Sequence, residues 1–253
     1  MIIYSLGVVN AVKAEIAECC KRLRLSKNIA AICDQTEADS YQEYLLKILQ
    51  RELAYRQTAR KNRLIKQAGF YSLKTFDGYS FDEIRFPSEL SVSALKTTTF
   101  IDEKKNLVLY GNVGTGKTHL ATAIGIEACN RGKTVRFFRT AALVNQLNEI
   151  HKNGDINRFF MQLAKTDLLI CDEWGYVPLD QAGSKLLFQV ISDCYEQRSV
   201  IITTNLEFSK WVNVFYDEQM TAAMIDRLVH HSYLLLFDGE SYRIKNSLMR
   251  DRP

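Results

Sequence analysis

Proline and glycine are scarce in this sequence, with only 3 prolines and 12 glycines among 253 residues. This scarcity excludes long disordered, low-complexity or collagen-like segments, which are rich in these two residues. Hydrophobic residues make up 47% of the chain and charged residues 25%, as in ordinary globular proteins. We therefore expect a folded chain whose size fits either one large domain or one ordinary domain with a small appendage.

Long apolar runs are also absent, and none approaches the roughly 18 residues that a membrane-spanning helix needs. The apolar start MIIYSLGVV has neither the basic segment nor the small-residue cleavage site of a signal peptide. These absences predict a cytoplasmic protein without a membrane partner.

Signatures of a metal-binding domain are missing as well. The six cysteines form no CxxC pair and show no zinc-type spacing, which favours reduced, structural thiols. Only four histidines occur, and two of them, His230 and His231, are adjacent. Because the side chains of neighbouring residues diverge on a regular helix or strand, we predict that these two do not chelate a metal ion together.

Positive charge is concentrated in the first part of the chain. Residues 1–75 contain 13 Lys and Arg against 7 Asp and Glu, a net charge of +6, whereas the remainder has 20 against 22, a net charge of −2. A basic segment joined to a nearly neutral body suggests a polyanionic partner for that segment.

This basic segment has a helical pattern. Residues 8–68 show neither strand-like alternation nor a Gly/Pro turn cluster. The motif SYQE is a capping box, with Ser40 as the N-cap and Glu43 as its partner. It predicts a long helix that ends at Ala68, before Gly69.

One face of this long helix changes character along its length. Leu46, Leu49 and Leu53 form an apolar stripe that can pack against another element. The stripe continues in basic residues that can bind DNA phosphate, namely Arg56, Arg60 and Arg63. The alternative is a solvated helix end without a ligand. The net positive charge around the stripe favours nucleic acid.

The pattern changes after a connector over residues 71–105. Five short apolar runs then alternate with helical stretches: NLVLYG (106–111), TVRFF (134–138), DLLICDE (167–173), SVIITTN (199–205) and YLLLF (233–237). Strands that alternate with helices predict an α/β domain with a parallel sheet covered on both faces. We therefore expect an all-helical domain for DNA binding or oligomerisation over residues 1–70, the connector over residues 71–105, and an α/β domain over residues 106–253.

The motif GNVGTGKT follows the first apolar run and precedes a helical stretch, which is the context of a phosphate-binding P-loop. Its glycines let backbone N–H groups close around phosphates, and the following helix adds donors and its positive end. Lys117 is expected to reach the β- and γ-phosphates, and Thr118 to place its hydroxyl on Mg²⁺. The predicted ATP contacts are Gly111, Asn112, Val113, Gly114, Thr115, Gly116, Lys117, Thr118 and His119.

Two later runs end in polar residues, at the edge of the sheet where α/β proteins bind ligands. The run LLICDE delivers Asp172, predicted to support the Mg²⁺ shell, and Glu173, predicted to polarise the attacking water. The run IITTN delivers Asn205, which can hold the water or the γ-phosphate. Taken alone, the acidic pair could form an exposed turn, and Asn205 could also end its strand in a simple turn.

These motifs belong to a larger pattern. GNVGTGKTHLA, LLICDEWGYVPLD, IITTNLEFSKW, AAMIDRLVHHS and GESYRIK together resemble the IstB family of transposition helper ATPases, relatives of the DnaC helicase loaders within the AAA+ class. The resemblance extends over about residues 20–247, and GYVPLD and DRLVHHS are its specific part. It implies an AAA+ fold with ATP and Mg²⁺ as cofactors. It also implies Asn205 as a polar sensor, Arg227 as an arginine finger for a neighbouring subunit's nucleotide, and Arg243 as a second sensor acting in cis.

The chain departs from this family in two places. Cys194 stands where relatives often carry arginine, so any role of that arginine is lost or passes to Arg198. Only 16 residues follow the last predicted strand, so we expect no C-terminal helical lid and a short tail that carries Arg243. Arg227 also has a structural alternative, a surface pair with Asp226, although adjacent residues point apart on a helix.

The resemblance implies a DNA-associated protein of the bacterial cytoplasm that hydrolyses ATP. Such a protein would oligomerise on duplex DNA with ATP at its subunit interfaces, remodel the DNA, and recruit and stimulate its cognate transposase. The alternative is a DnaC-like loader of a replicative helicase. The arginine stripe and the segments GYVPLD and DRLVHHS favour transposition.

Overall fold

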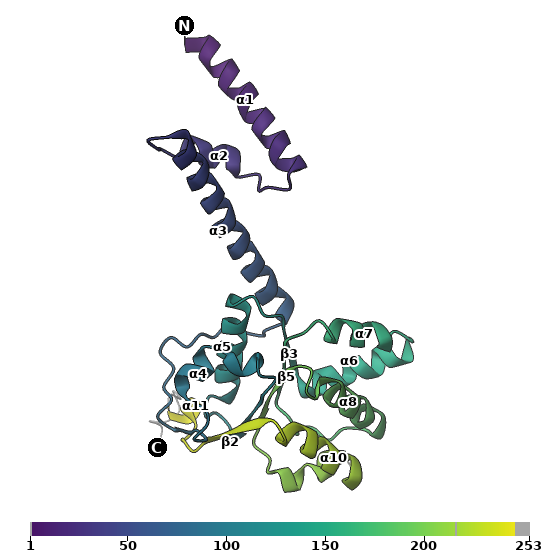
Figure 1. Cartoon of the computed structure of the whole chain (residues 1–253). Coiled ribbons are helices and arrows are strands. Elements are labelled where there is room, and N and C mark those ends of the chain that lie inside the picture. Colours follow the sequence, from purple (N-terminus) through teal and green to yellow (C-terminus); the bar gives the residue numbers. More distant parts are fainter. Residues whose placement is uncertain (1, 216, 246–253) are drawn as a thin grey trace, which may run out of the picture. The chain divides into compact units, whose positions relative to one another are not determined.

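A computed structural model describes residues 2–215 and 217–245, and the chain divides into two compact units between Arg63 and Leu64. The first unit is helical and the second is an α/β unit (Figure 1). The sequence places the end of the helical domain at residue 70 instead. The units divide earlier because Leu64 and Ala68 are already buried in the core of the α/β unit.

The helical unit consists of α1 (Ile2–Arg22), α2 (Ile29–Asp34) and the greater part of α3 (Tyr41–Ala68). Its small core contains Cys20, Ile29 and Ile48. The capping box forms at the start of α3: Glu43 N–H donates to Ser40 Oγ at 3.2 Å. The Glu43 carboxylate accepts a 3.0 Å hydrogen bond from the backbone N–H of Asp39, one residue earlier than the N-cap.

The leucine stripe does not pack within this unit. The face of α3 that turns inward carries Ile48 and Glu52, whereas Leu46, Leu49 and Leu53 are exposed, Leu53 by 59%. Helical spacing identifies the residues that share a face, but it cannot say which of two faces the neighbouring helices cover.

Six strands form one sheet in the order β1-β6-β2-β5-β4-β3. Its five parallel strands confirm the five predicted runs: β2 (Asn106–Gly111), β3 (Val135–Arg139), β4 (Leu168–Asp172), β5 (Ser199–Thr204) and β6 (Ser232–Phe237). The strand β1 (Ile84–Arg85), which pairs antiparallel with β6, was not predicted. A strand of two residues is too short to show a period.

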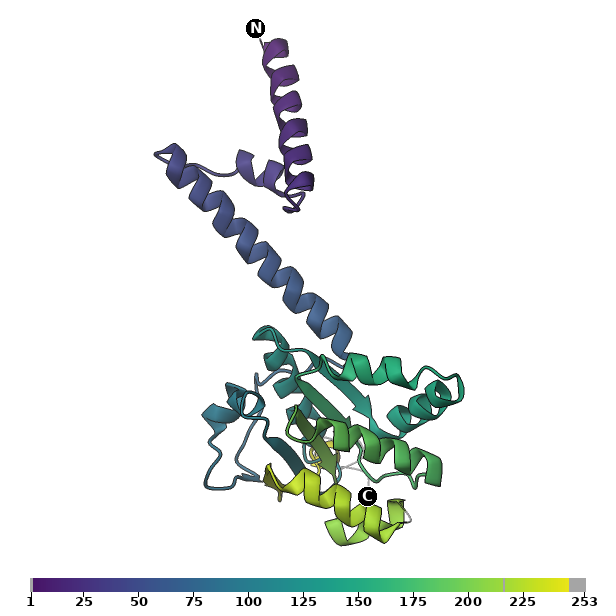
Figure 2. The same ribbon diagram turned by 45° about the vertical axis from the view of Figure 1, so that its right-hand side comes forward.

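Helices cover both faces of the sheet (Figures 1 and 2). On one face lie α4 (Val92–Lys96), the 3-10 turn η1 (Thr99–Ile101) and α5 (Lys117–Asn130). The other face packs against α6 (Thr140–Lys152), α7 (Ile156–Leu163), α8 (Gln181–Cys194), α9 (Val212–Phe215) and α10 (Glu218–Val229). The remaining elements are the 3-10 turn η2 (Phe208–Lys210) and α11 (Tyr242–Lys245).

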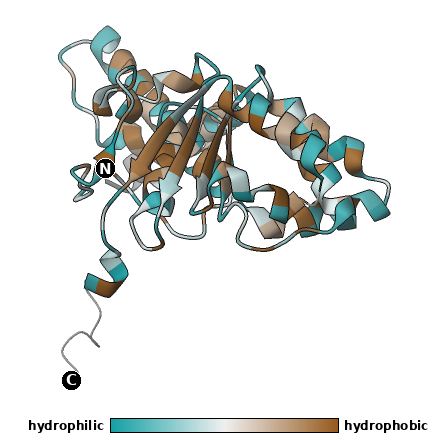
Figure 3. Ribbon diagram, turned by 90° about the horizontal axis from the view of Figure 1, so that it is seen from below, coloured by the Kyte–Doolittle hydropathy of each residue, from teal (hydrophilic) through white to brown (hydrophobic). Residues whose placement is uncertain are grey.

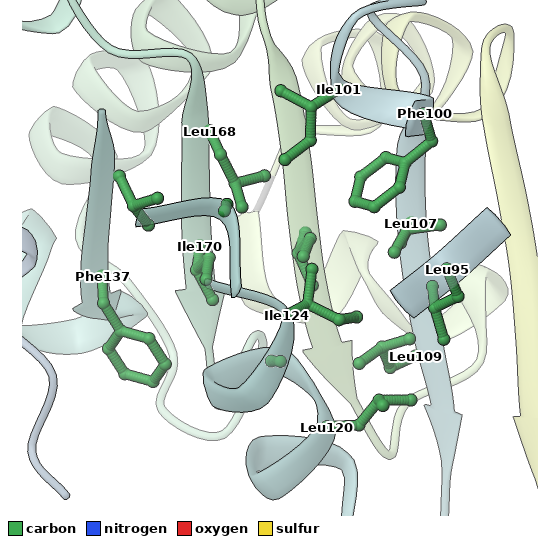
Figure 4. Packing of buried hydrophobic residues seen from close by; sticks show 14 of the residues in the cluster. Leu95, Phe100, Ile101, Leu107, Leu109, Leu120, Ile124, Phe137, Leu168 and Ile170 are labelled. Atoms are coloured by element: carbon green, nitrogen blue, oxygen red, sulfur yellow. The ribbon is translucent and has the colours of Figure 1, made fainter. Parts of the chain in front are cut away.

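Alternate residues of the strands serve two separate cores. In β4, Leu168 and Ile170 belong to the cluster under α5, whereas Leu169 and Cys171 belong to the cluster under α6 and α8. Strands buried on both faces are apolar throughout, as the brown strands of Figure 3 show. Figure 4 shows the first cluster, which includes Leu95, Phe100, Ile101, Leu107, Leu109, Leu120, Ile124, Phe137, Leu168 and Ile170.

The expected connector is partly built into this core. Leu90, Leu95, Phe100 and Ile101 are buried in the cluster under α5, so residues 84–105 form part of the α/β unit. Across the described residues, no helix combines the length and the apolar character needed to span a membrane.

Candidate functional site

The loop between β2 and α5 has the close approaches that its glycines predict. Gly111 and Gly114 have φ angles of +153° and +82°. A Cβ on Gly111 would lie 2.3 Å from the carbonyl oxygen of Phe237, and one on Gly114 would lie 2.1 Å from Ser241 Oγ. A side chain at either position would therefore push the loop away from β6 and from the segment that follows it.

Lys117 begins α5 and is folded back inside this loop. Its Nζ donates to the carbonyl oxygens of Gly111 at 2.7 Å and Asn112 at 2.5 Å, and the residue is only 6% exposed. The pKa of Lys117 is lowered to about 8, mainly by burial, with Asp172 opposing the change and the nearby charge of Arg243 contributing to it. A cation held among carbonyl oxygens at the start of a helix is placed to bind the β- and γ-phosphates of a nucleotide.

Asp172 ends β4 and lies beside the loop. Its Oδ1 accepts hydrogen bonds from Thr118 Oγ1 at 2.8 Å and from Thr203 Oγ1 at 2.5 Å. Thr140 Oγ1 donates to the main-chain oxygen of Asp172 at 2.9 Å. The structure thus brings Thr118 and Asp172 together. A hydroxyl and a carboxylate oxygen are donors that suit Mg²⁺, so these residues fit that ion.

Glu173 follows in an uncommon backbone conformation. Its φ of +57° is left-handed, and its N–H donates to Thr203 Oγ1 at 3.0 Å. The side chain is 45% exposed, and its carboxylate lies 3.7 Å from Arg139 Nε. The guanidinium of Arg139 in turn lies 4.4 Å from the centre of the Tyr71 ring. The left-handed turn directs Glu173 away from the buried strand, and this position suits a group that must contact water.

Thr203 is a site residue that was not predicted from the sequence. It is 2% exposed, and its one hydroxyl contacts both acidic residues, as donor to the Asp172 carboxylate and as acceptor from the Glu173 backbone. The motif IITTN contained the signal, because a polar residue inside a fully buried strand needs a partner. Asn205 follows β5 at the same edge of the sheet and is half-buried.

The segment before the sheet also contributes to the loop. Tyr79 donates its hydroxyl to the carbonyl oxygen of Gly116 at 3.3 Å, and its ring lies 4.9 Å from that of His119. Burial raises the pKa of Tyr79, so its hydroxyl stays protonated and able to donate. His119 Nε2 lies 2.9 Å from the carbonyl oxygen of Thr75. His119 therefore connects the predicted nucleotide loop to the aromatic segment around Tyr79, which was predicted only to be part of a connector.

The segment after β6 packs on the other side of the loop. The N–H of Tyr242 donates to the carbonyl oxygen of Gly114 at 3.0 Å. A cavity of about 460 Å³ opens there, lined by Asn112, Val113, Gly239, Glu240, Ser241, Ile244 and Lys245. Arg243 lies on this short tail, near enough to Lys117 to influence its pKa. The tail therefore brings a second cation towards the same loop.

Arg227 lies at the opposite edge of the sheet. Its helix, α10, leads into β6, whose first residue Ser232 pairs with Asn106 at the start of β2. The P-loop follows the end of β2, and six residues of strand span about 20 Å. The guanidinium lies 5.1 Å from the Phe188 ring centre and donates to the carbonyl oxygen of Ala223 at 3.0 Å. The backbone of Arg227 therefore lies at the amino ends of the strands, and its side chain packs against α8 at Phe188.

The predicted DNA-binding arginines all lie exposed on α3. Arg56 has a structural partner, because its Nε donates to the buried Glu52 carboxylate at 2.7 Å and it also donates to the carbonyl oxygen of Arg24. Glu52 is 3% exposed, and Ser26 N–H also donates to it at 2.9 Å. Arg56 thus helps to hold the helical unit together.

Comparison with protein families gives one long match. A family model described as IstB-like ATP binding protein covers residues 19–250. A protein of Geobacillus stearothermophilus, named as an ATP-binding protein of insertion sequence IS5376, is 36% identical over 94% of this chain and 97% of its own length. The corresponding protein of insertion sequence IS21 from Pseudomonas aeruginosa is 33% identical, over 89% of this chain and 86% of its own length.

Solved structures resemble the α/β unit at lower identity. The DnaC helicase loader is 23% identical, with a TM-score of 0.51, over 64% of this chain and 96% of its own. DnaA from Aquifex aeolicus bound to AMPPCP is also 23% identical, with a TM-score of 0.53, over 68% of this chain and 52% of its own. At this identity the likeness shows the fold alone. It confirms the predicted α/β fold with a parallel sheet.

Proposed function

The chain belongs to the family of IstB-like ATP binding proteins, and on this premise we propose that it is the helper ATPase of a transposase, assembling on duplex DNA with ATP between its subunits. The family resemblance and the predicted class of enzyme, an ATPase, are confirmed by this membership. Its relatives carry the names of insertion-sequence proteins, which supports a role in transposition.

The observation that supports hydrolysis best is the joint position of the P-loop and the end of β4. ATP binds with its phosphates in the loop and against Lys117, and Thr118 with Asp172 would hold Mg²⁺, which neutralises charge on the phosphates. Water attacks the γ-phosphorus, the bond to the bridging oxygen breaks, and Glu173 accepts the proton of the water. Asn205 orients the water or the γ-phosphate from the end of β5.

The place of Arg227 supports completion of the site by a neighbouring subunit. This residue lies at the edge of the sheet away from its own P-loop, a position that favours action on the nucleotide of another chain. A permanently charged, forked guanidinium stabilises the charge that develops on transferring phosphate oxygens. Arg243 approaches the P-loop of its own chain, as expected of a sensor acting in cis.

The helical unit supplies the proposed DNA contact. Arg60 and Arg63 lie one turn apart on the exposed side of α3, in a segment with a net charge of +6. Such a pair binds the phosphate backbone without reading sequence, and this suits a helper that acts at many target sites. Recruitment of the transposase is proposed from the insertion-sequence relatives. A loader of a replicative helicase shares the fold, but the family match favours transposition.

The test is the size of the assembly on duplex DNA, measured by analytical ultracentrifugation with and without ATP. We expect a large complex that needs both DNA and ATP.

Arg60→Glu with Arg63→Glu should weaken DNA binding and reduce the dependence of log K on log salt by about one per arginine. Lys152→Glu with Lys165→Glu, a charge reversal of the same size at exposed positions of the α/β unit, is the matched control. Equal DNA binding by the double variant and the control would contradict the proposed DNA contact, and capture of a helicase in place of a transposase would contradict the role in transposition.

A further inference from the structure

A compact group of side chains at the edge of the sheet opposite the P-loop has no part in ATP hydrolysis. His230 and His231 form the turn between α10 and β6, and Glu196 lies in the turn between α8 and β5. The ligand atoms of these three residues all lie within 4.8 Å of one another. The expectation that adjacent histidines diverge is wrong here, because the regular helix ends at Val229 and the two residues occupy a turn.

The backbone that carries this group is fixed from inside the protein. The buried Asn106 donates its backbone N–H to the carbonyl oxygen of His231 at 2.7 Å and its side-chain amide to that of Leu228 at 3.1 Å. Its side-chain oxygen accepts a 2.8 Å hydrogen bond from the N–H of Val200. One buried residue therefore ties the end of α10 to the start of β5, so the side chains start from fixed positions.

The distances within the group suit a transition-metal ion. Nε2 of His231 and Oε1 of Glu196 are 3.2 Å apart, and the ring centres of the two histidines are 4.0 Å apart. Nitrogen and oxygen ligands at about 2.0–2.1 Å from a tetrahedral Zn²⁺ lie about 3.4 Å from one another. Small side-chain rotations would bring the third ligand atom to this spacing, since all three residues are at least partly exposed.

Tyr195 provides the outer partner that metal-binding histidines usually have. Its hydroxyl lies 2.8 Å from Nδ1 of His230, and its ring packs 6.0 Å from that of His230. A histidine whose Nδ1 donates to a hydroxyl presents the lone pair of Nε2 to a metal. When the Tyr195 hydroxyl accepts from Nδ1 in this way, Nε2 of His230 is available to an ion.

The geometry points to a binding site for a borderline transition-metal ion of the Zn²⁺ type, formed by Glu196, His230 and His231. Two imidazoles and one carboxylate favour such an ion over Mg²⁺ or Ca²⁺, which prefer oxygen ligands. The fourth position faces solvent. An ion held there joins the end of α10, the helix of Arg227, to the turn that follows α8.

The experiment is a titration of the full chain, without a histidine tag, with Zn²⁺ against a chelating dye. Excess Mg²⁺ keeps Zn²⁺ from the Thr118–Asp172 pair. We expect one Zn²⁺ bound per chain, and a loss of at least tenfold in affinity for His230→Ala, His231→Ala and Glu196→Gln. Tyr195→Phe should weaken binding by roughly 10-fold, as outer partners do. Co²⁺ should give the visible absorption of a tetrahedral site in the wild-type chain but not in His230→Ala or His231→Ala.

The controls separate this site from other zinc ligands. His151→Ala removes an exposed histidine of α6, and Cys19→Ser with Cys33→Ser removes thiols of the helical unit. Neither change should alter the affinity. Unchanged Zn²⁺ binding in His230→Ala and His231→Ala would overturn the site.

Thermal stability gives a second measurement of Zn²⁺ binding. Each variant is compared with itself, with Zn²⁺ and with a chelator, so a variant of lower stability can still be tested. Zn²⁺ at a hundredfold excess over Kd should raise the midpoint of thermal unfolding by roughly 5 °C. The isosteric Glu196→Gln should lose this rise while it keeps the midpoint seen with a chelator. If the histidine variants lower the midpoint equally with Zn²⁺ and with chelator, the group is a hydrogen-bonded cluster and not a metal site.

Discussion

The two edges of the sheet differ in what they contribute to ATP hydrolysis within a single chain. The edge at the carboxyl ends of the strands gathers the P-loop, Asp172, Glu173 and Asn205 within one chain. The edge at the amino ends carries Arg227, on a helix that leads into β6. A parallel sheet separates its edges by the length of its strands, so a cation at one edge cannot serve a phosphate at the other. In ATP hydrolysis, changes at the first edge should therefore act on each chain by itself, and loss of Arg227 only on assemblies.

The largest effect is expected for Arg227→Ala. Loss of the proposed arginine finger should lower the turnover of assembled protein by roughly 10³- to 10⁵-fold. Binding of a fluorescent ATP analogue to the free chain should not change, because Arg227 lies away from its own P-loop. Steady-state ATPase assays on duplex DNA, together with binding titrations, measure both. Asp226→Ala is the adjacent exposed control.

Mixing variants sharpens the comparison of the two edges. Arg227→Ala keeps an intact P-loop, and Lys117→Ala keeps an intact Arg227. Assemblies that contain both should regain part of the activity that each lacks alone. Failure to regain activity, in mixtures shown by ultracentrifugation to co-assemble, would mean that Arg227 acts within its own chain or only in folding.

At the other edge, Glu173→Gln should lower turnover by roughly 10²- to 10⁴-fold, the range of a lost general base. ATP should still bind and persist on the protein, because Lys117 and Asp172 remain in place. Single-turnover hydrolysis with labelled ATP is the measurement, and Glu207→Gln at an exposed position is its control. Near-normal turnover would remove Glu173 from the mechanism.

Thr203→Val tests the hydroxyl that contacts both acidic residues. Valine keeps the shape but leaves Asp172 and Glu173 without this partner, so we expect turnover to fall by roughly 10²-fold. The concentration of Mg²⁺ needed for half-maximal activity should rise. Thr204→Val is matched to it, since Thr204 lies next in β5 and donates to the carbonyl oxygen of Trp174. An equal Mg²⁺ requirement in Thr203→Val and Thr204→Val would show that the role of Thr203 is only structural.

The smallest effect is a pH dependence of nucleotide binding. Burial brings the pKa of Lys117 to about 8, so the fraction of charged ammonium falls as pH rises through 8. Between pH 7 and pH 9 that fraction drops roughly 10-fold, which sets the upper limit of the loss in ATP affinity. Lys117→Arg, which stays charged, should bind with little change over this range. Equal pH profiles for lysine and arginine would show that another group titrates.

Local patterns sufficed for most of the α/β unit. Every predicted apolar run forms a strand, because a strand buried on both faces must be apolar along its whole length. The P-loop could be predicted from its glycines. A side chain at Gly111 or Gly114 would clash with neighbouring atoms, so the backbone requires glycine there. These features depend on neighbours in the sequence, so the sequence alone predicts them.

Contacts between distant segments could not be predicted in the same way. Thr203 lies 31 residues from Asp172 in the chain, and Tyr79 lies 37 residues from Gly116. The leucine stripe of α3 looked like a packing face, yet α1 and α2 cover the side with Ile48. A helical period shows that residues share a face but not which neighbour meets it.

The segment AAMIDRLVHHS shows which features the sequence determines and which depend on the tertiary structure. The sequence by itself determined a helix with an arginine at the margin of its apolar face, followed by two histidines. Only the tertiary structure decided that this arginine lies across the sheet from its own P-loop, and that the turn after the helix brings both histidines to Glu196. The reason is that periodicity and spacing act within a few residues, whereas the pairing of strands and the ends of helices fix positions across the whole sheet.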